Sequence, residues 1–190
     1  MFNPAWYNNY MWSLIAAFAV LLATLIATLF MLNALYSVFR LRIPYVPTAA
    51  WAVKWLHDKY PLPPGATVYD MGCGDGRVLA ELAVKNPDAK FIGIEVQWWP
   101  YVLAKWRARK IINLTIERVD FWSRDIHDAT HVFCYLFQPI LVKMKNKFET
   151  ELRPNTMVIS FGFRIPDWTT KNEIADPNGK THSRLLFYRR

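Results

Sequence analysis

The stretch Val68 to Arg77, VYDMGCGDGR, decides the fold of this 190-residue chain. It places Asp70 at the end of a strand-like run, and three alternating glycines then lead into a helix-like segment. Glycine is needed where the backbone turns with positive φ or where a ligand lies against the main chain, and the amides at a helix N-terminus suit a carboxylate or phosphate. The spacing G-x-G-x-G differs from the G-x-G-x-x-G of dinucleotide sites, and the Gly-Lys-Ser/Thr of a phosphate-binding loop does not follow. The stretch therefore predicts a ligand-binding turn between a strand and a helix.

Strand and helix patterns alternate around this turn. Strand-like runs cover 66–72, 90–96, 114–120, 131–137 and 156–163, and helical patterns cover 75–85, 98–110 and 140–152. The tail from Lys171 breaks the alternation, because two strand-like runs are joined there by a turn signal at Asp176 to Gly179. The predicted fold class is therefore α/β: a Rossmann-like, doubly wound sheet of seven strands that ends in a C-terminal antiparallel hairpin.

The segment ahead of the turn divides the chain into further parts. A proline-punctuated linker leads into a short helix, which Thr48 is expected to cap and which Lys59 to Pro61 would end. We therefore expect three regions: an N-terminal tail and apolar helix over 1–39, a linker with a short covering helix over 40–64, and the main domain over 65–190.

The N-terminal region carries no charged side chain. The chain has a net charge of +8, yet all 23 basic and 15 acidic residues lie at or after Arg40. The run from Trp12 to Phe39 is almost wholly apolar and exceeds the ~20 residues that cross a bilayer core. Aromatic residues that fit interfacial belts flank it, namely Trp6, Tyr7, Tyr10, Trp12 and Tyr36. A cleaved signal peptide is the alternative, but the basic start is missing and the apolar run is too long.

The charges that follow the apolar run predict its orientation. Arg40, Arg42 and Lys54 come after it, whereas only the amino terminus precedes it. Because basic residues stay on the cytoplasmic side, we expect a single-pass protein with its N-terminus outside and its main domain inside. The cell membrane is the expected location, with the mitochondrial inner membrane as the alternative.

Two further acidic residues follow successive strand-like runs. Glu95 ends the second run, where a carboxylate at the switch point of an open α/β sheet accepts hydrogen bonds from ribose hydroxyls. Asp120 follows the third run, where it suits an adenine amine while Phe121 packs on the ring. Each residue alone is compatible with a solvated loop, but their order and spacing favour one nucleoside site.

These motifs resemble those of a known class of enzyme. VYDMGCGDGR, then GIEV, then VDFW are similar to the motif series of class I, seven-strand S-adenosylmethionine-dependent methyltransferases. PYVPT from Pro44 to Thr48, GIEVQWW, and YLFQPILVKMKNKFETELRPNTMVISFGFRIPDW resemble, more narrowly, the membrane-anchored lysine methyltransferases of the ATP synthase c-subunit and the adenine nucleotide translocase, with their prokaryotic relatives. The resemblance spans roughly Pro44 to Trp168.

The resemblance implies S-adenosyl-L-methionine as cofactor and S-adenosylhomocysteine as product. Glu95 would hold the ribose, and Asp120 with Phe121 would hold the adenine. Tyr45 and Thr48 would belong to a segment that covers the cofactor. The methionine part would lie against the glycine turn, formed by Asp70, Gly72, Cys73, Gly74 and Asp75.

The acceptor side is expected after the fourth strand-like run. Amine-modifying methyltransferases place a substrate-facing loop where this chain has Tyr135 to Pro139. The same residues are equally compatible with a strand end followed by a proline that starts a helix. Tyr135, Phe137 and Trp122 are the candidates for an aromatic channel wall, and Asp120 is the acid nearest to it. A lysine amine desolvated in such a channel has a lowered pKa, so a dedicated base is not required.

Three functions follow from these observations. The first is methylation of a lysine amine of a membrane-associated protein; the second is methylation of a lipid, quinone or other small amphiphile; the third is a non-catalytic cofactor-binding or assembly module. Nucleic acid is not expected as a partner, because the basic runs at 105–110 and 143–147 suit anionic lipid beside a membrane anchor. No metal is expected, because His127 and His131 lack a matching acid and Cys73 and Cys134 show no ligand spacing.

Overall fold

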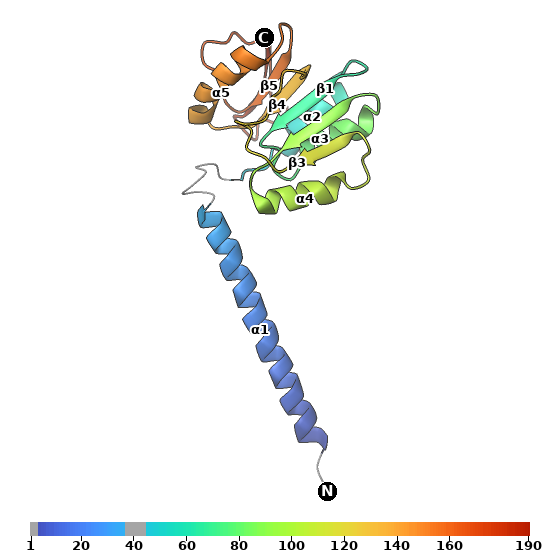
Figure 1. The fold of residues 1–190 in the computed structure, drawn as a ribbon, viewed down its shortest axis with the longest axis vertical. Helices are drawn as coiled ribbons and strands as arrows, with labels where there is room; N and C mark the ends of the chain where they lie inside the picture. Colours follow the sequence, from blue (N-terminus) through green and yellow to red (C-terminus); the bar gives the residue numbers. More distant parts are fainter. Residues whose placement is uncertain (1–3, 37–44) are drawn as a thin grey trace. The chain divides into compact units, whose positions relative to one another are not determined.

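A computed structural model describes residues 4–36 and 45–190, with side chains for 9–32, 35 and 45–190. The chain divides into two compact units, Met1–Pro44 and Tyr45–Arg190. Figure 1 shows the first unit as one long helix and the second as a sheet covered by helices.

The first unit is the helix α1, Pro4–Tyr36. Its segment Asn9–Leu32 is, by length and composition, apolar enough to cross a membrane, and none of this segment is buried inside the protein. The hydroxyls of Ser13, Thr24 and Thr28 donate to carbonyls three or four residues earlier at 2.8 Å, which removes unpaired polar groups from its surface. Residues 37–44, which include the predicted end of the apolar run and both Arg40 and Arg42, lie outside the described residues, as do the side chains of Trp6, Tyr7 and Tyr36.

The second unit is built on one sheet of seven strands in the order β3-β2-β1-β4-β5-β7-β6. The strands are β1 Thr67–Met71, β2 Lys90–Ile94, β3 Leu114–Glu117, β4 His131–Cys134, β5 Met157–Phe161, β6 Asn172–Ala175 and β7 Arg184–Arg189. The first five run parallel, whereas β7 pairs antiparallel with both β5 and β6. The predicted doubly wound α/β sheet and its C-terminal antiparallel hairpin are thereby confirmed.

Helices cover both faces of this sheet. They are α2 Ala50–Lys59, α3 Arg77–Lys85, α4 Trp98–Ala108 and α5 Gln138–Glu151. Phe187 of β7 packs against Trp55 and Tyr60 at the α2 side, with ring centroids 5.8 and 5.5 Å away. The next residue, Tyr188, faces the α5 side through Trp168. Because neighbouring residues of a strand point to opposite faces, α2 and α5 lie on opposite sides of the sheet.

The positions of the remaining helices agree with the winding of the chain. α2 packs on α3, and α3 packs on α4, so these three helices share one face. Figure 1 shows α4 beside β3 and α5 beside β4 and β5, at different ends of the sheet. Right-handed crossovers that run outward from β1 in two directions require this arrangement.

Two details differ from the sequence prediction. Thr48 does not cap α2: the N-cap is Ala49, whose carbonyl accepts from the amides of Ala52 and Val53, while Thr48 lies one residue earlier and is buried. The strands are also shorter than their apolar runs, and β4 stops at Cys134 rather than at Phe137. In β2, β3, β4 and β5 the last apolar residues of the run lie in the loop that leaves the sheet.

Candidate functional site

The register of the parallel strands brings the predicted residues to one edge of the sheet. Met71 lies opposite both Ile94 and Cys134, and Cys134 lies opposite Ser160. The chain therefore leaves β1, β2, β4 and β5 side by side. β1 lies between β2 and β4, where the winding reverses, and ligands of open α/β sheets bind outside the strand ends at such a point.

The turn after β1 wraps tightly around the end of β2. The amides of Gly72 and Cys73 both donate to the carbonyl of Ile94, at 2.9 and 2.8 Å. The Cys73 side chain points into the core, where a Cβ on Gly93 would come within 2.8 Å of its Sγ. Cys73 thus contributes its backbone to the turn, and its thiol belongs to the packing beneath it.

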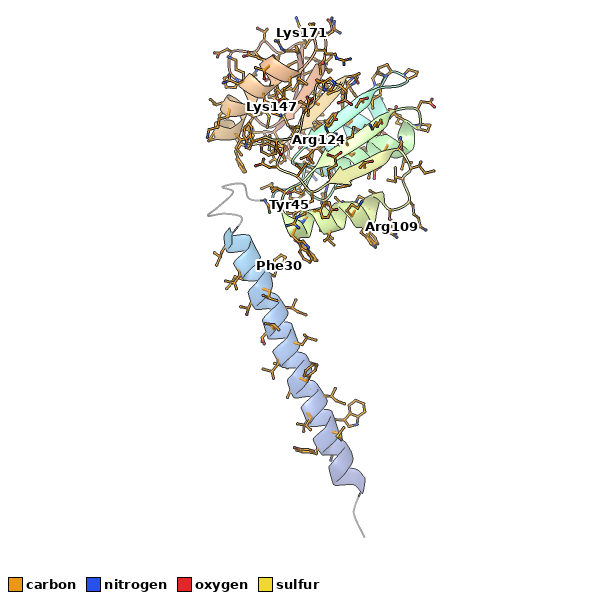
Figure 2. All side chains as sticks on the ribbon, in the orientation of Figure 1. Phe30, Tyr45, Arg109, Arg124, Lys147 and Lys171 are labelled. Carbon is orange, nitrogen blue, oxygen red and sulfur yellow. The ribbon has the colours of Figure 1, made fainter. Side chains whose placement is uncertain are left out.

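Gly74 is the residue of the turn that permits a close aromatic neighbour. Its φ is +56°, a region that residues with a side chain rarely adopt. A Cβ at this position would lie 2.8 Å from Cε2 of Tyr45. The Tyr45 ring therefore lies directly against the glycine turn, at the start of the second unit, where Figure 2 labels it.

Glu95 joins the turn to the end of β2. Its Oε2 accepts from the amide of Gly74 at 2.9 Å, and its Oε1 accepts from the amide of Gln97 at 2.7 Å. Burial raises the pKa of this carboxyl, and the amide hydrogen bonds oppose that rise. A carboxylate held from two sides keeps a fixed orientation and retains lone pairs for a further donor.

Asp70 is the most buried acid of the site, with 2% of its surface exposed. Burial raises its pKa well above the usual value, and the nearby charges of Glu95 and Asp75 raise it further. Three carboxyl groups thus converge beneath the turn at the end of β1 and β2. Such a cluster is costly by itself and suits a positively charged ligand.

Asp75 differs from the other two acids because it has arginine partners. Arg77 and Arg107 contact its carboxylate at 2.9 and 2.8 Å, and Arg107 also donates to its backbone carbonyl. Burial opposes ionisation of Asp75, but the two guanidinium groups outweigh it and hold the pKa below its usual value. The sequence prediction assigned no role to either arginine. Arg77 stands in the quoted motif two residues after Asp75, whereas Arg107 comes from α4, 32 residues later.

Asp120, Phe121 and Trp122 form the turn that follows β3. The Asp120 carboxylate accepts from the amide of Trp122 at 3.0 Å, Phe121 is buried, and the two rings meet edge to face at 4.9 Å. The buried ammonium of Lys147 pairs with Glu151 at 2.6 Å and lies 3.5 Å from the Trp122 carbonyl. Glu151 in turn accepts from the amide of Ile126, so α5 fixes this segment in place.

Aromatic residues occupy the other half of the edge, after β4 and β5. Phe163 joins the two predicted residues there: its ring centroid lies 6.4 Å from Tyr135 and 5.4 Å from Phe137. Tyr135 also meets Phe161 edge to face at 4.8 Å. A Cβ on Gly162, whose φ is +81°, would lie 3.3 Å from the Tyr135 ring. We call Tyr135, Phe137, Phe161 and Phe163 the aromatic group.

The two halves meet at the end of β1. A Cβ on Gly72 would lie 3.4 Å from Cδ2 of Leu136, the residue between Tyr135 and Phe137. The structure thus brings together the glycine turn, Glu95, Tyr45 and the start of the aromatic group. Trp122 packs on Phe121 instead, and Thr48 is buried beside α2. The sequence prediction assigned no role to Phe161, the last residue of β5, or to Phe163 after it, because apolar residues at a strand end look like part of the strand.

Solved structures share this arrangement of strands and helices. An RNA methyltransferase from Salinibacter ruber, in complex with S-adenosyl-L-homocysteine, covers 76% of this chain and 93% of its own, with a TM-score of 0.68 and 24% identity. A precorrin-6y C5,15-methyltransferase from Geobacter metallireducens covers 76% of this chain and 89% of its own, with a TM-score of 0.59 and 12% identity. The fold is that of class I S-adenosylmethionine-dependent methyltransferases.

Sequence relatives narrow this class to one family. Residues 70–172 match the ANTKMT methyltransferase domain. A protein-lysine N-methyltransferase from Saccharolobus islandicus is 30% identical over 149 residues, which are 77% of this chain and 92% of that protein. The chain belongs to the ANTKMT methyltransferase family, and it is a homologue of a protein-lysine N-methyltransferase. The predicted class of enzyme and its family are confirmed.

Proposed function

We propose that this methyltransferase transfers a methyl group to a lysine amine of a membrane-associated protein. The observation that carries the proposal is the pairing of two unlike halves at one sheet edge: buried carboxyls after β1 and β2, and the aromatic group after β4 and β5. The relative from Saccharolobus islandicus, named for lysine methylation, supports the choice of acceptor.

The carboxyl half fits the cationic methionine part and the ribose of S-adenosylmethionine. Asp70, Asp75 and the turn amides would hold the methionine part, with Tyr45 covering it, since these acids converge on the turn. Glu95 would accept from the ribose hydroxyls with its remaining lone pairs. Asp120 and Phe121 would hold the adenine on the segment fixed by α5.

The aromatic half suits the acceptor amine. When bound, the cofactor supplies an activated sulfonium methyl, so the protein has chiefly to hold the nucleophile in line with it. A free lysine has a pKa of about 10.4 and must lose its proton before it attacks. Tyr135, Phe137 and Phe163 would exclude water around the amine and lower its pKa. Trp122 would extend this wall from the β3 side, and the Asp120 carboxylate would take up the proton.

The membrane part of the proposal rests on α1. Its apolar segment Asn9–Leu32 has no buried part and the length to span a bilayer. With Arg40 and Arg42 after the span, the N-terminus would lie outside and the methyltransferase unit in the cytoplasm. Acceptors within reach of the membrane surface would then be modified first.

Methyl transfer to the protein's own membranes tests the proposal. The full chain is incubated with radiolabelled S-adenosylmethionine and membranes from its source, and label is measured in precipitated protein and in the lipid extract. We expect label in protein, on lysine after hydrolysis, and none with Glu95→Gln. Glu117→Gln serves as the matched control, because Glu117 ends β3 and pairs with Arg124. This variant is expected to retain methyl transfer. Label confined to lipid would overturn the lysine assignment in favour of an amphiphile.

A further inference from the structure

We propose that the outer face of α4 binds the surface of an anionic lipid bilayer, as a membrane contact of the methyltransferase unit itself. We define this α4 face by Trp98, Val102, Lys105, Trp106 and Arg109, continued by Lys110 and Ile112 in the following turn. The proposal does not rest on the lysine substrate, because it concerns contact between this surface and lipid and not the transfer of a methyl group.

The residues of the α4 face share one side of the helix. They recur at intervals of three and four residues, which places them in one row. Trp98 is 51% exposed, Trp106 is 63% exposed, and Ile112 is fully exposed. Pro100, Ala104 and Ala108, on the opposite side of α4, are buried. Figure 2 shows Arg109 at the end of α4, on the margin of the unit.

Charge on this segment has one sign. No acidic residue occurs between Glu95 and Glu117, while four basic residues do. Arg107 is turned toward Asp75, so Lys105, Arg109 and Lys110 are the cations left on the outer side, all three exposed. The Arg109 guanidinium lies 4.0 Å above the Trp106 ring, which keeps cation and aromatic surface together.

Tryptophan with lysine and arginine fits a bilayer surface better than water or nucleic acid. Indole rings prefer the boundary between headgroups and acyl chains, and basic residues are attracted to anionic headgroups. The aliphatic side chains of Val102 and Ile112 find apolar contacts in lipid that a polynucleotide lacks. The same chain also carries the apolar helix α1, which would hold the unit close to a bilayer.

Spin labelling of the full chain tests this surface. Cys73 and Cys134 are buried, so a nitroxide is attached at Ile112→Cys on the α4 face or, as a control, at Val142→Cys on α5, which covers the other face of the sheet. Each protein is placed in nanodiscs of phosphatidylcholine, with or without phosphatidylglycerol. Collision with dissolved oxygen and with a water-soluble nickel chelate is then measured by electron paramagnetic resonance.

In anionic discs we expect the label at 112 to lose nickel accessibility and gain oxygen accessibility, with no change at 142. The triple change Lys105→Glu, Arg109→Glu, Lys110→Glu is expected to abolish this shift while S-adenosylhomocysteine binding stays at the wild-type level, which shows a folded unit. Equal accessibility at 112 in both kinds of disc would overturn the proposal. Immobilisation of the label by added single-stranded RNA, without any response to anionic lipid, would also overturn it in favour of nucleic acid.

Discussion

Two parts of the sheet edge, which we call corners, have a similar backbone and different side chains: the charged corner after β1 and the aromatic corner after β5. After β1, Gly74 adopts a positive φ beneath the ring of Tyr45; after β5, Gly162 does so beneath the ring of Tyr135. The first corner gathers the buried acids Asp70 and Glu95, whereas the second gathers phenylalanine rings. The difference supports the proposal that one edge serves two ligands: a charged corner for a cationic cofactor and a dry corner for an amine that must lose its proton.

The largest expected effect comes from a substitution that changes only the charged corner. Glu95→Gln replaces one carboxylate oxygen by an amide donor that faces the amide of Gly74 or of Gln97. It would also weaken the proposed contact with the ribose. We expect S-adenosylhomocysteine to bind about 100-fold more weakly, as for loss of a charged hydrogen-bond acceptor. Isothermal titration calorimetry measures this, with Glu117→Gln as the control. A weakening below threefold in Glu95→Gln would refute the ribose role.

The next effect belongs to the aromatic corner. Phe163→Ala removes the ring that joins Tyr135 and Phe137. We expect kcat/KM for the methyl acceptor to fall roughly 10-fold, because the wall around the amine loses its packing. The affinity for S-adenosylhomocysteine should stay within threefold of wild type, since the acids of the other corner are untouched. Equal losses in both quantities would mean that the two corners do not divide the ligands.

Alanine substitution of Gly74 and of Gly162 compares the backbone of the two corners. An alanine at position 74 or 162 must adopt the left-handed conformation of the glycine that it replaces. Its Cβ would lie 2.8 Å from the Tyr45 ring at position 74 and 3.3 Å from the Tyr135 ring at position 162. Each change is expected to cost ~1–2 kcal/mol in free energy of unfolding from backbone conformation, with the larger cost at Gly74. Urea denaturation measures both variants, and a larger loss for Gly162→Ala would contradict this comparison.

The smallest expected effect concerns the stability of the charged corner. The folded-state pKa of Asp70 is raised by burial and by Glu95 and Asp75, so its contribution to stability is full below the unfolded-state pKa and is lost as pH rises through the folded value. Asp70→Asn is therefore expected to raise the stability of the ligand-free protein by ~1 kcal/mol near neutral pH. Differential scanning fluorimetry between pH 4 and 8 should show this advantage growing with pH. A constant difference would rule out titration of Asp70 as its source.

The charged corner was more predictable from sequence than the aromatic one. Asp70, the glycines and Glu95 stand directly at strand ends, so the βαβ pattern alone brings them to one edge. The contact of Gly74 with Tyr45, and the pairing of Asp75 with Arg107, depend on packing between distant segments. No local pattern encodes such contacts.

The aromatic corner and the start of helix α2 show where local patterns mislead. Phe161 ends β5 and Phe163 follows it, and both read as one strand run, although β4 and β5 end before their apolar runs do. Thr48 has the residue type of a helix cap, yet the N-cap of α2 is the next residue, Ala49, and Thr48 is buried. In both cases tertiary packing, rather than local propensity, sets where the element begins or ends.

A crystal structure of the full chain with S-adenosylhomocysteine tests the central claim most directly. We predict the ribose hydroxyls within about 2.5–3.0 Å of the Glu95 carboxylate, with the sulfur directed toward Tyr135 and the aromatic group. A ligand bound elsewhere, or one whose sulfur faces away from the aromatic group, would contradict the division of this edge into a cofactor corner and an acceptor corner.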